Sequence, residues 1–132
     1  KGFKNHFKNL NKIKLFHEIG NFTYEGGFES AKKLLKKNIT ALFCADDTMA
    51  FGCLDYIKEN TKLNIPKEIE IIGYDDISTA NWHSYNLTTI RQPIRQMSKL
   101  VTQIIDDNIK DPEFEPINHV IQGKFIYRNT TR

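Results

Sequence analysis

The sequence is poor in cysteine and has no long apolar run, and both absences restrict what the chain can be. Its two cysteines, Cys44 and Cys53, lack the C-x-x-C spacing and the nearby histidines of a zinc site. Buried free thiols are therefore favoured over a disulfide or a metal-binding pair. No stretch is long enough to span a bilayer, and the first residues, K-G-F-K-N-H-F-K, are too polar for a signal peptide. We expect no membrane partner.

The chain also lacks a large excess of charge of either sign. With 19 basic and 16 acidic residues, the net charge of +3 is too small to indicate that this segment binds nucleic acid. The sequence has no G-x-S-x-G motif, no P-loop and no cysteine–histidine pairing, so we expect no catalysis, no metal and no cofactor. A length of 132 residues, 39% of them hydrophobic and 27% charged, predicts one domain's worth of chain with a buried core.

Hydrophobic periodicity divides the chain into helices and strands. Apolar residues recur at helical spacing in residues 2–10, 23–37, 47–60 and 94–109. Extended segments are expected at 13–19, 39–45, 69–74, 87–92 and 117–128, the last interrupted at Gly123. The strand–helix–strand order of the first half predicts an α/β fold with a Rossmann-like parallel sheet. The last helix should bury an apolar stripe formed by Ile94, Met97, Leu100, Val101, Ile104 and Ile105.

Two of the predicted strands end in pairs of carboxylates. Asp46-Asp47 follows the strand at 39–45, and Asp75-Asp76 follows the strand at 69–74. The carboxyl ends of parallel strands meet at one edge of a sheet, where open α/β proteins bind their ligands. The two acidic pairs therefore predict a ligand site at that edge.

Four motifs occur in order along the chain: G-N-F-T-Y-E-G-G, A-D-D-T-M-A-F-G at 45–52, I-I-G-Y-D-D at 71–76 and L-T-T-I-R-Q-P at 87–93. With them, the whole chain resembles the effector-binding domain of LacI/GalR-family transcription regulators. The resemblance implies a periplasmic-binding-protein-like domain of two lobes, with a small effector in the cleft. Residues 1–90 and 122–132 would form most of the carboxyl-terminal lobe, and residues 91–121 a segment of the amino-terminal lobe. The DNA-binding headpiece would lie outside this chain.

Asp75 and Asp46 are the expected acidic contacts to the effector. A carboxylate such as Asp75 can accept paired hydrogen bonds from vicinal hydroxyls. Its alternative role, capping the turn that follows, suits Asp76 better. The position of Asp46 is usually Asn in the family and touches the effector, whereas its alternative role here is to cap the 47–60 helix. If both carboxylates face one cleft, their repulsion favours a cationic or amino-bearing ligand or raises one pKa.

The resemblance also places Phe22 and Gln92 at the effector. An aromatic at the position of Phe22 stacks on the effector ring in many family members, and its alternative role is in the core. Gln92 lies on a strand that crosses between lobes, where its amide can bind the effector or make only hinge hydrogen bonds. Neither alternative is decided by the sequence.

A homodimer is expected from the family. Phe51 on the 47–60 helix is predicted to be exposed and to form a two-fold contact with the 80–86 loop, which carries His83 and Tyr85. Trp82, the only tryptophan, belongs to the cleft mouth or to this interface.

The resemblance implies the ligand-sensing domain of a cytoplasmic DNA-binding repressor, with a sugar as effector and operator DNA as the partner of the headpiece. The alternative is a sugar-binding protein of a transport system with the same fold. Acidic pairs at strand ends also occur in phosphoacceptor receiver domains. That class requires a lysine at a later strand end, and none is present.

Overall fold

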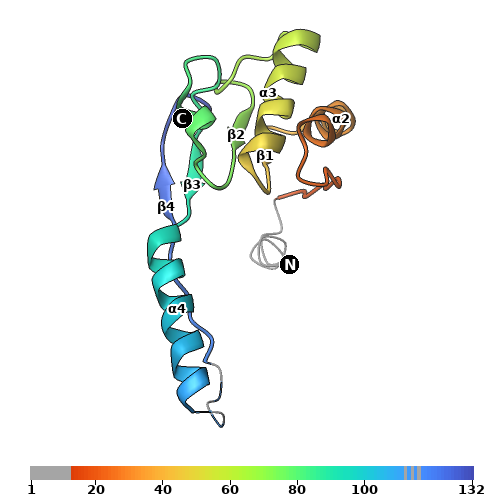
Figure 1. The fold of residues 1–132 in the computed structure, drawn as a ribbon. Helices are drawn as coiled ribbons and strands as arrows, with labels where there is room; N and C mark the ends of the chain where they lie inside the picture. The colour runs from red at the N-terminus through yellow and green to blue at the C-terminus, as the bar shows by residue number, and fades with distance from the viewer. Residues whose placement is uncertain (1–12, 112, 114, 116) are drawn as a thin grey trace.

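The computed structural model describes residues 13–111, 113, 115 and 117–132. They form a body of short strands and packed helices, from which one long helix projects (Figure 1). The predicted helix at residues 2–10 lies outside the described residues.

The body is built on four short strands, which form two two-stranded sheets joined by isolated bridges. Strand β1 (Ala41–Phe43) pairs in parallel with β2 (Glu70–Ile72). Strand β3 (Thr89–Arg91) pairs antiparallel with β4 (Lys124–Ile126). Two parallel bridges, Ile72–Thr88 and Asp75–Arg91, join β2 to β3. The order across the joined sheets is therefore β1-β2-β3-β4, and the predicted α/β fold with a parallel sheet is confirmed.

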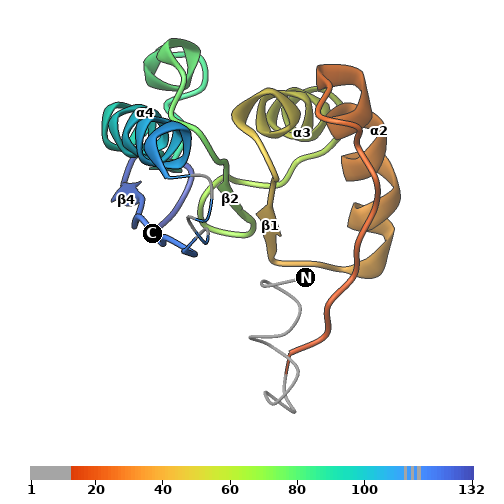
Figure 2. The same ribbon diagram turned by 60° about the horizontal axis from the view of Figure 1, so that its bottom comes forward.

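Helices α2 (Tyr24–Leu34) and α3 (Asp47–Asn60) lie beside each other in the body (Figure 2). Thr23 caps α2 by accepting a hydrogen bond from the Gly26 amide, and a 3₁₀ turn, η1 (Leu35–Lys37), extends the helix. Their backbones approach closely because Gly27 and Gly52 carry no side chain. The predicted helices at 23–37 and 47–60 are confirmed.

The core lies between these helices and the sheet. Its fully buried large side chains come from α3, β2 and the segments beside them: Leu54, Ile57, Ile69, Ile71 and Leu87. Cys44 and Cys53 belong to this core. Both are free and buried, and their Sγ atoms lie 3.8 Å apart, so the expectation of buried free thiols is confirmed.

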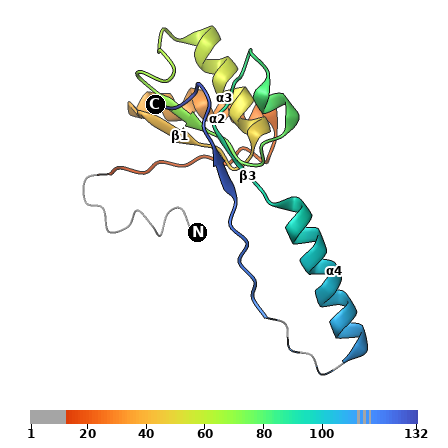
Figure 3. The same ribbon diagram turned by 90° about the vertical axis from the view of Figure 1, so that its left-hand side faces the viewer.

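Helix α4 (Ile94–Lys110) projects from the body, and residues 117–123 return beside it (Figure 3). The prediction of a buried stripe on this helix is wrong. None of its described residues is buried, and Ile94 and Ile105 are each more than half exposed. The amphipathic pattern correctly predicted a helix, but among the described residues the face that it marks meets only the returning chain, across a groove of about 450 Å³.

Two predicted strands also differ from the structure. Residues 13–19 form no ladder, and their apolar side chains Ile13, Leu15, Phe16 and Ile19 are exposed. An alternating pattern makes a strand only where a neighbouring strand supplies hydrogen bonds. The segment at 117–128 shortens to β4 for the same reason. None of the described helices is long and apolar enough to cross a membrane.

Candidate functional site

The predicted site residues gather at the carboxyl edge of the sheet. At the end of β2, a side chain on Gly73 would collide with the Asp47 carboxylate, so the β2 end lies against the start of α3. A side chain on Gly20 would collide with Met49 in the first turn of the same helix. Phe22 follows that glycine and is 69% exposed. The loop of Phe22, the cap of α3 and the end of β2 therefore meet at one edge.

Asp46 caps helix α3. Its Oδ1 accepts a hydrogen bond of 2.7 Å from the Met49 amide, as the alternative reading of this residue predicted. The side chain remains partly exposed at the sheet edge. Capping fixes the carboxylate beside the site and leaves effector contact by Asp46 as a prediction.

Asp75 and Gln92 are brought into direct contact. The Gln92 side-chain amide donates a hydrogen bond to Oδ1 of Asp75. The Asp75 amide donates in turn to the Ile90 carbonyl at 2.9 Å, which fastens the turn to β3. Asp75 does not cap the turn that follows, because the Ile77 amide donates to Oδ2 of Asp47 at 2.9 Å. Two residues predicted separately thus form one polar pair.

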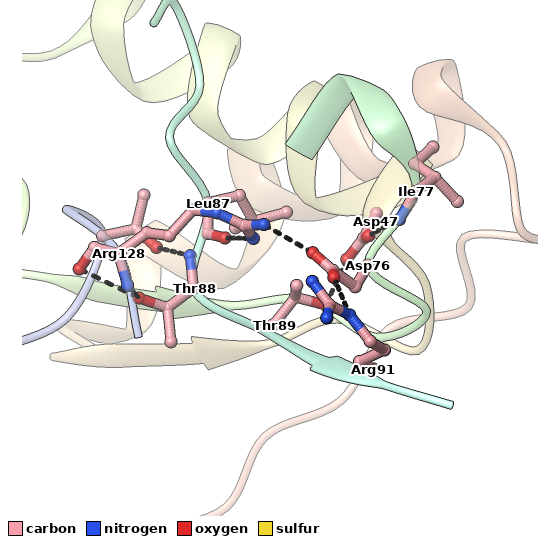
Figure 4. A network of polar contacts seen from close by, with 9 residues as sticks. Asp47, Asp76, Ile77, Leu87, Thr88, Thr89, Arg91 and Arg128 are labelled. Carbon is pink, nitrogen blue, oxygen red and sulfur yellow. Dashed lines mark hydrogen bonds and ion pairs between the residues drawn. The ribbon is translucent and has the colours of Figure 1, made fainter. Parts of the chain in front are cut away.

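Asp47 holds the turn after β2 in place through its buried carboxylate. The sequence identifies it only as a member of an acidic pair. It is fully buried, and besides the Ile77 amide it accepts a 2.6 Å hydrogen bond from the Thr89 hydroxyl (Figure 4). Burial raises the pKa of the Asp47 carboxyl above its ordinary value, and the charge of Asp75 raises it further. The two hydrogen bonds lower this pKa but do not cancel the rise. The expected repulsion between two acidic groups concerned Asp46 and Asp75 and stays a prediction; the carboxyl whose pKa the charge of Asp75 raises is that of Asp47.

Asp76 was predicted only as the cap of the turn that follows, and this prediction is wrong, because the Ile77 amide donates to Asp47 instead. Its carboxylate receives Nη2 of Arg128 at 2.6 Å and Nε of Arg91 at 2.5 Å, and its side chain is 4% exposed (Figure 4). Burial alone would raise the pKa of Asp76, but the hydrogen bonds and charges of Arg128 and Arg91 lower it overall. The only available signal was the acidic pair itself, since Arg128 lies 52 residues away in sequence.

The prediction that Phe51 is exposed is wrong. Phe51 is 5% exposed and stacks on Tyr85 with ring centroids 4.3 Å apart, because the 80–86 loop folds back over α3. The Tyr85 hydroxyl donates to Asp55 at 3.0 Å, which ties the loop down. Trp82 and His83, at the outside of this loop, are exposed.

We expect Asp47→Asn to change how stability depends on pH. Because the folded-state pKa is raised from 3.8, the folded chain binds more protons than the unfolded chain above that pH. Stability therefore falls as pH rises from 3.8 through the raised value. Asparagine does not ionise, so the unfolding free energy of the variant relative to the native protein should increase with pH. Urea denaturation at a series of values from roughly pH 4 to 7 measures this difference.

Asp76→Asn is the control with the opposite sign. The folded-state pKa of Asp76 is lowered, so its contribution is present above 3.8 and is lost as pH falls through the lowered value. Its removal should therefore cost more at neutral pH than in acid. A relative stability of Asp47→Asn that does not change with pH would contradict the proposed burial effect.

Among the described residues, no group of three or more His, Cys, Asp and Glu side chains is arranged to hold a metal ion. The chemistry present at the edge is one carboxylate–amide pair, one capping carboxylate and one exposed aromatic ring. Such a set can bind hydroxyl groups and an apolar ring face.

Comparison with known proteins identifies a family and several relatives. The family described as "Periplasmic binding protein-like domain" matches residues 7–131. The HTH-type transcriptional repressor PurR of Vibrio campbellii is 37% identical over 115 residues, covering 86% of this chain and 34% of the relative. The PurR of Aliivibrio salmonicida is 41% identical over 100 residues, covering 70% of this chain and 30% of the relative. The chain thus spans about a third of the length of these curated relatives.

Solved structures agree with this result. A LacI family transcriptional regulator from Enterococcus faecium with bound ribose has a TM-score of 0.80 and 30% identity, over 98% of this chain and 49% of that chain. The lac repressor dimer bound to operator and an anti-inducer has a TM-score of 0.83 and 26% identity, over 98% of this chain and 46% of that chain. The relatives are transcriptional repressors and regulators, in agreement with the expectation of a protein without catalysis.

Proposed function

The chain belongs to the periplasmic binding protein-like family, as an effector-binding domain of the LacI/GalR type, and from this premise we propose that it senses a small sugar for a transcriptional repressor. The observation that carries the proposal is the Asp75–Gln92 pair at the carboxyl edge of the sheet. Gln92 occupies one oxygen of the Asp75 carboxylate, and a ligand hydroxyl can donate to the other. Hydrogen bonds to a charged group are the stronger kind, so this pair can orient a polyol.

The exposed ring of Phe22 supports a ring-shaped effector. The ring is 69% exposed and therefore lies outside the core, in a loop whose backbone φ at Phe22 is 57°. An aromatic face fits the C–H face of a sugar or the plane of a base. Ribose in the regulator that is 30% identical favours the sugar.

The projecting segment supports a division into two lobes. We propose that residues 91–121 belong to the amino-terminal lobe and that residues 1–90 and 122–132 belong to the carboxyl-terminal lobe. Helix α4 leaves the body directly after β3, and its apolar face is exposed among the described residues. A helix with such a face requires a partner surface. The effector would bind between the two lobes.

DNA binding, dimerisation and location are further parts of the proposal. The curated relatives are named as helix-turn-helix repressors, and one solved relative is a dimer on its operator. We propose that this domain acts with a DNA-binding headpiece in a cytoplasmic homodimer. Of the three residues expected at the contact, His83 and Tyr85 remain in the proposed interface, together with exposed Trp82. Phe51 does not, because Tyr85 covers it.

Isothermal titration calorimetry on the native protein tests the proposed effector class. The titrants are neutral sugars, beginning with D-ribose, and the nucleobases adenine and guanine. We expect saturable heat from a sugar, a rise in melting temperature, and a change in operator affinity at saturating sugar. Binding of a base without any sugar would overturn the sugar assignment. If the native protein bound sugar but no operator, the transport alternative would replace the repressor.

A further inference from the structure

The turn that carries Asp75 has an unfavourable backbone. Asp75 has a φ of 116° and Asp76 a φ of 58°, so two consecutive residues with side chains lie in the region that favours glycine. Such conformations cost free energy and persist only where the surrounding contacts determine them. The contacts around this turn should therefore reveal what holds it.

Both ends of the turn are fixed by backbone groups. The Asp75 amide donates to Ile90 on β3, and the Ile77 amide donates to the buried carboxylate of Asp47. Between these anchors, the side chain of Asp76 points toward the two arginines (Figure 4). Arg128 is itself held, since its Nη1 donates to the Leu87 carbonyl at 2.7 Å.

Two side-chain pairs connect the turn to the end of β3. Asp75 pairs with Gln92, and Asp76 pairs with the adjacent Arg91. Asp75 and Arg91 are also partners in a parallel bridge. The two pairs are therefore neighbouring links between the same two segments: one is predicted to face the effector, and the other joins the buried Asp76 carboxylate to the partly exposed Arg91.

Burial makes the Asp76 link strong. The Asp76 side chain is 4% exposed and that of Arg128 is 10% exposed, so neither charge can leave the other without remaining unpaired in a poorly solvated place. The Arg91 side chain is 56% exposed and adds a second cation from β3. A rotation of the Asp76 backbone toward an ordinary φ would break both ion pairs.

We propose that Asp76 is a positioning residue: its ion pairs with Arg91 and Arg128 hold the turn so that Asp75, joined to Gln92, presents its carboxylate to the effector. The proposal rests on the proposed function, because it assigns a role in that same site. Asp76 itself need not touch the effector.

Effector affinity and global stability, measured on the same variants of the native protein, test the proposal. Asp76→Ala removes both ion pairs, and alanine disfavours the left-handed backbone. Asp76→Asn keeps hydrogen-bond acceptors and tolerates that backbone. With D-ribose as titrant, we expect roughly 10- to 100-fold weaker binding for Asp76→Ala and a smaller loss for Asp76→Asn. Operator affinity without sugar should change less than about 2-fold.

Glu70→Gln is the matched control. It removes the ion pair between Glu70 and Arg132, in which Oε1 and Nε lie 2.8 Å apart. Glu70 is at the opposite end of β2 from the turn, so the turn stays intact. We expect native ribose affinity from it. Native affinity in Asp76→Ala, with lowered unfolding free energy alone, would reduce Asp76 to a structural role and overturn the proposal. If Asp76→Ala does not fold, Arg91→Gln replaces it, with an expected loss of roughly 3- to 10-fold; native affinity there overturns the proposal equally.

A crystal structure of Asp76→Ala, or of Arg91→Gln if Asp76→Ala does not fold, gives a readout that requires no ligand. The structure of Asp76→Asn gives the comparison. We expect the Asp75 φ to leave the left-handed region and the Asp75–Gln92 hydrogen bond to be lost in Asp76→Ala or Arg91→Gln. An unchanged turn would overturn the positioning role whatever the effector is. If the native protein binds neither sugar nor base, the proposed function fails. If the native protein binds sugar and the Asp76 variants bind it with native affinity, the proposed function stands and this inference alone fails.

Discussion

Replacing Asp75 by alanine in the native protein is expected to abolish the response to effector while leaving effector-free operator binding nearly intact. The ligand would lose its hydrogen bond to the second oxygen of the carboxylate, a bond worth about 1.5–3 kcal/mol, so affinity should fall roughly 10- to 150-fold. The Gln92 amide would also lose the acceptor that orients it. Calorimetry with sugar and operator titrations with and without sugar measure the two effects separately.

The separation of these effects follows from linkage. A ligand shifts an equilibrium between lobe arrangements only by its differential affinity for them, commonly about 1–3 kcal/mol of coupling. A site that contacts only the effector can therefore lose the response without losing DNA affinity. Glu70→Gln, on the same strand but away from the turn, should retain both. Loss of operator binding with normal sugar affinity in Asp75→Ala would refute the site assignment.

The site could be predicted in part because two signals are readable in short stretches of sequence: acidic residues after apolar strands, and a motif that resembles a known family. Asp75 and Asp46 each follow an apolar strand, and parallel strands place their carboxyl ends together. Gln92 came from the resemblance of its motif to a family. The direct Asp75–Gln92 hydrogen bond was not predictable, because it depends on how the turn after β2 is rotated. That rotation is set by Asp76 and Arg128, which lie 52 residues apart.

The parts of the fold that were predicted wrongly share one physical cause. Residues 13–19 and the α4 stripe carry apolar patterns, yet a pattern states only which face seeks a partner. The described residues supply no ladder for the first and only the returning chain for the second. Phe51 shows the converse. Its side chain looked superfluous to the sheet, but Tyr85 covers it after the 80–86 loop folds back.

The packing of α2 on α3 yields the largest expected effect on stability. A Cβ placed on Gly52 would fall on the Tyr24 carbonyl oxygen and lie 2.8 Å from the Phe28 amide nitrogen. Both obstacles are backbone atoms, so no rotamer change can relieve them, and the helices must separate. We expect Gly52→Ala to cost about 3 kcal/mol or more, despite the roughly 1 kcal/mol that alanine gains over glycine in a helix.

Gly20→Ala is the comparison that isolates this cause. Its new methyl group would meet the end of the flexible Met49 side chain, which can move, before it meets backbone. Urea denaturation should therefore show a small loss for Gly20→Ala and a large one for Gly52→Ala. Because the same two helices carry the Phe22 loop and the Asp46 cap at their first turns, their separation should also weaken sugar binding. Equal stability losses in the two variants would show that close backbone packing does not hold α2 against α3.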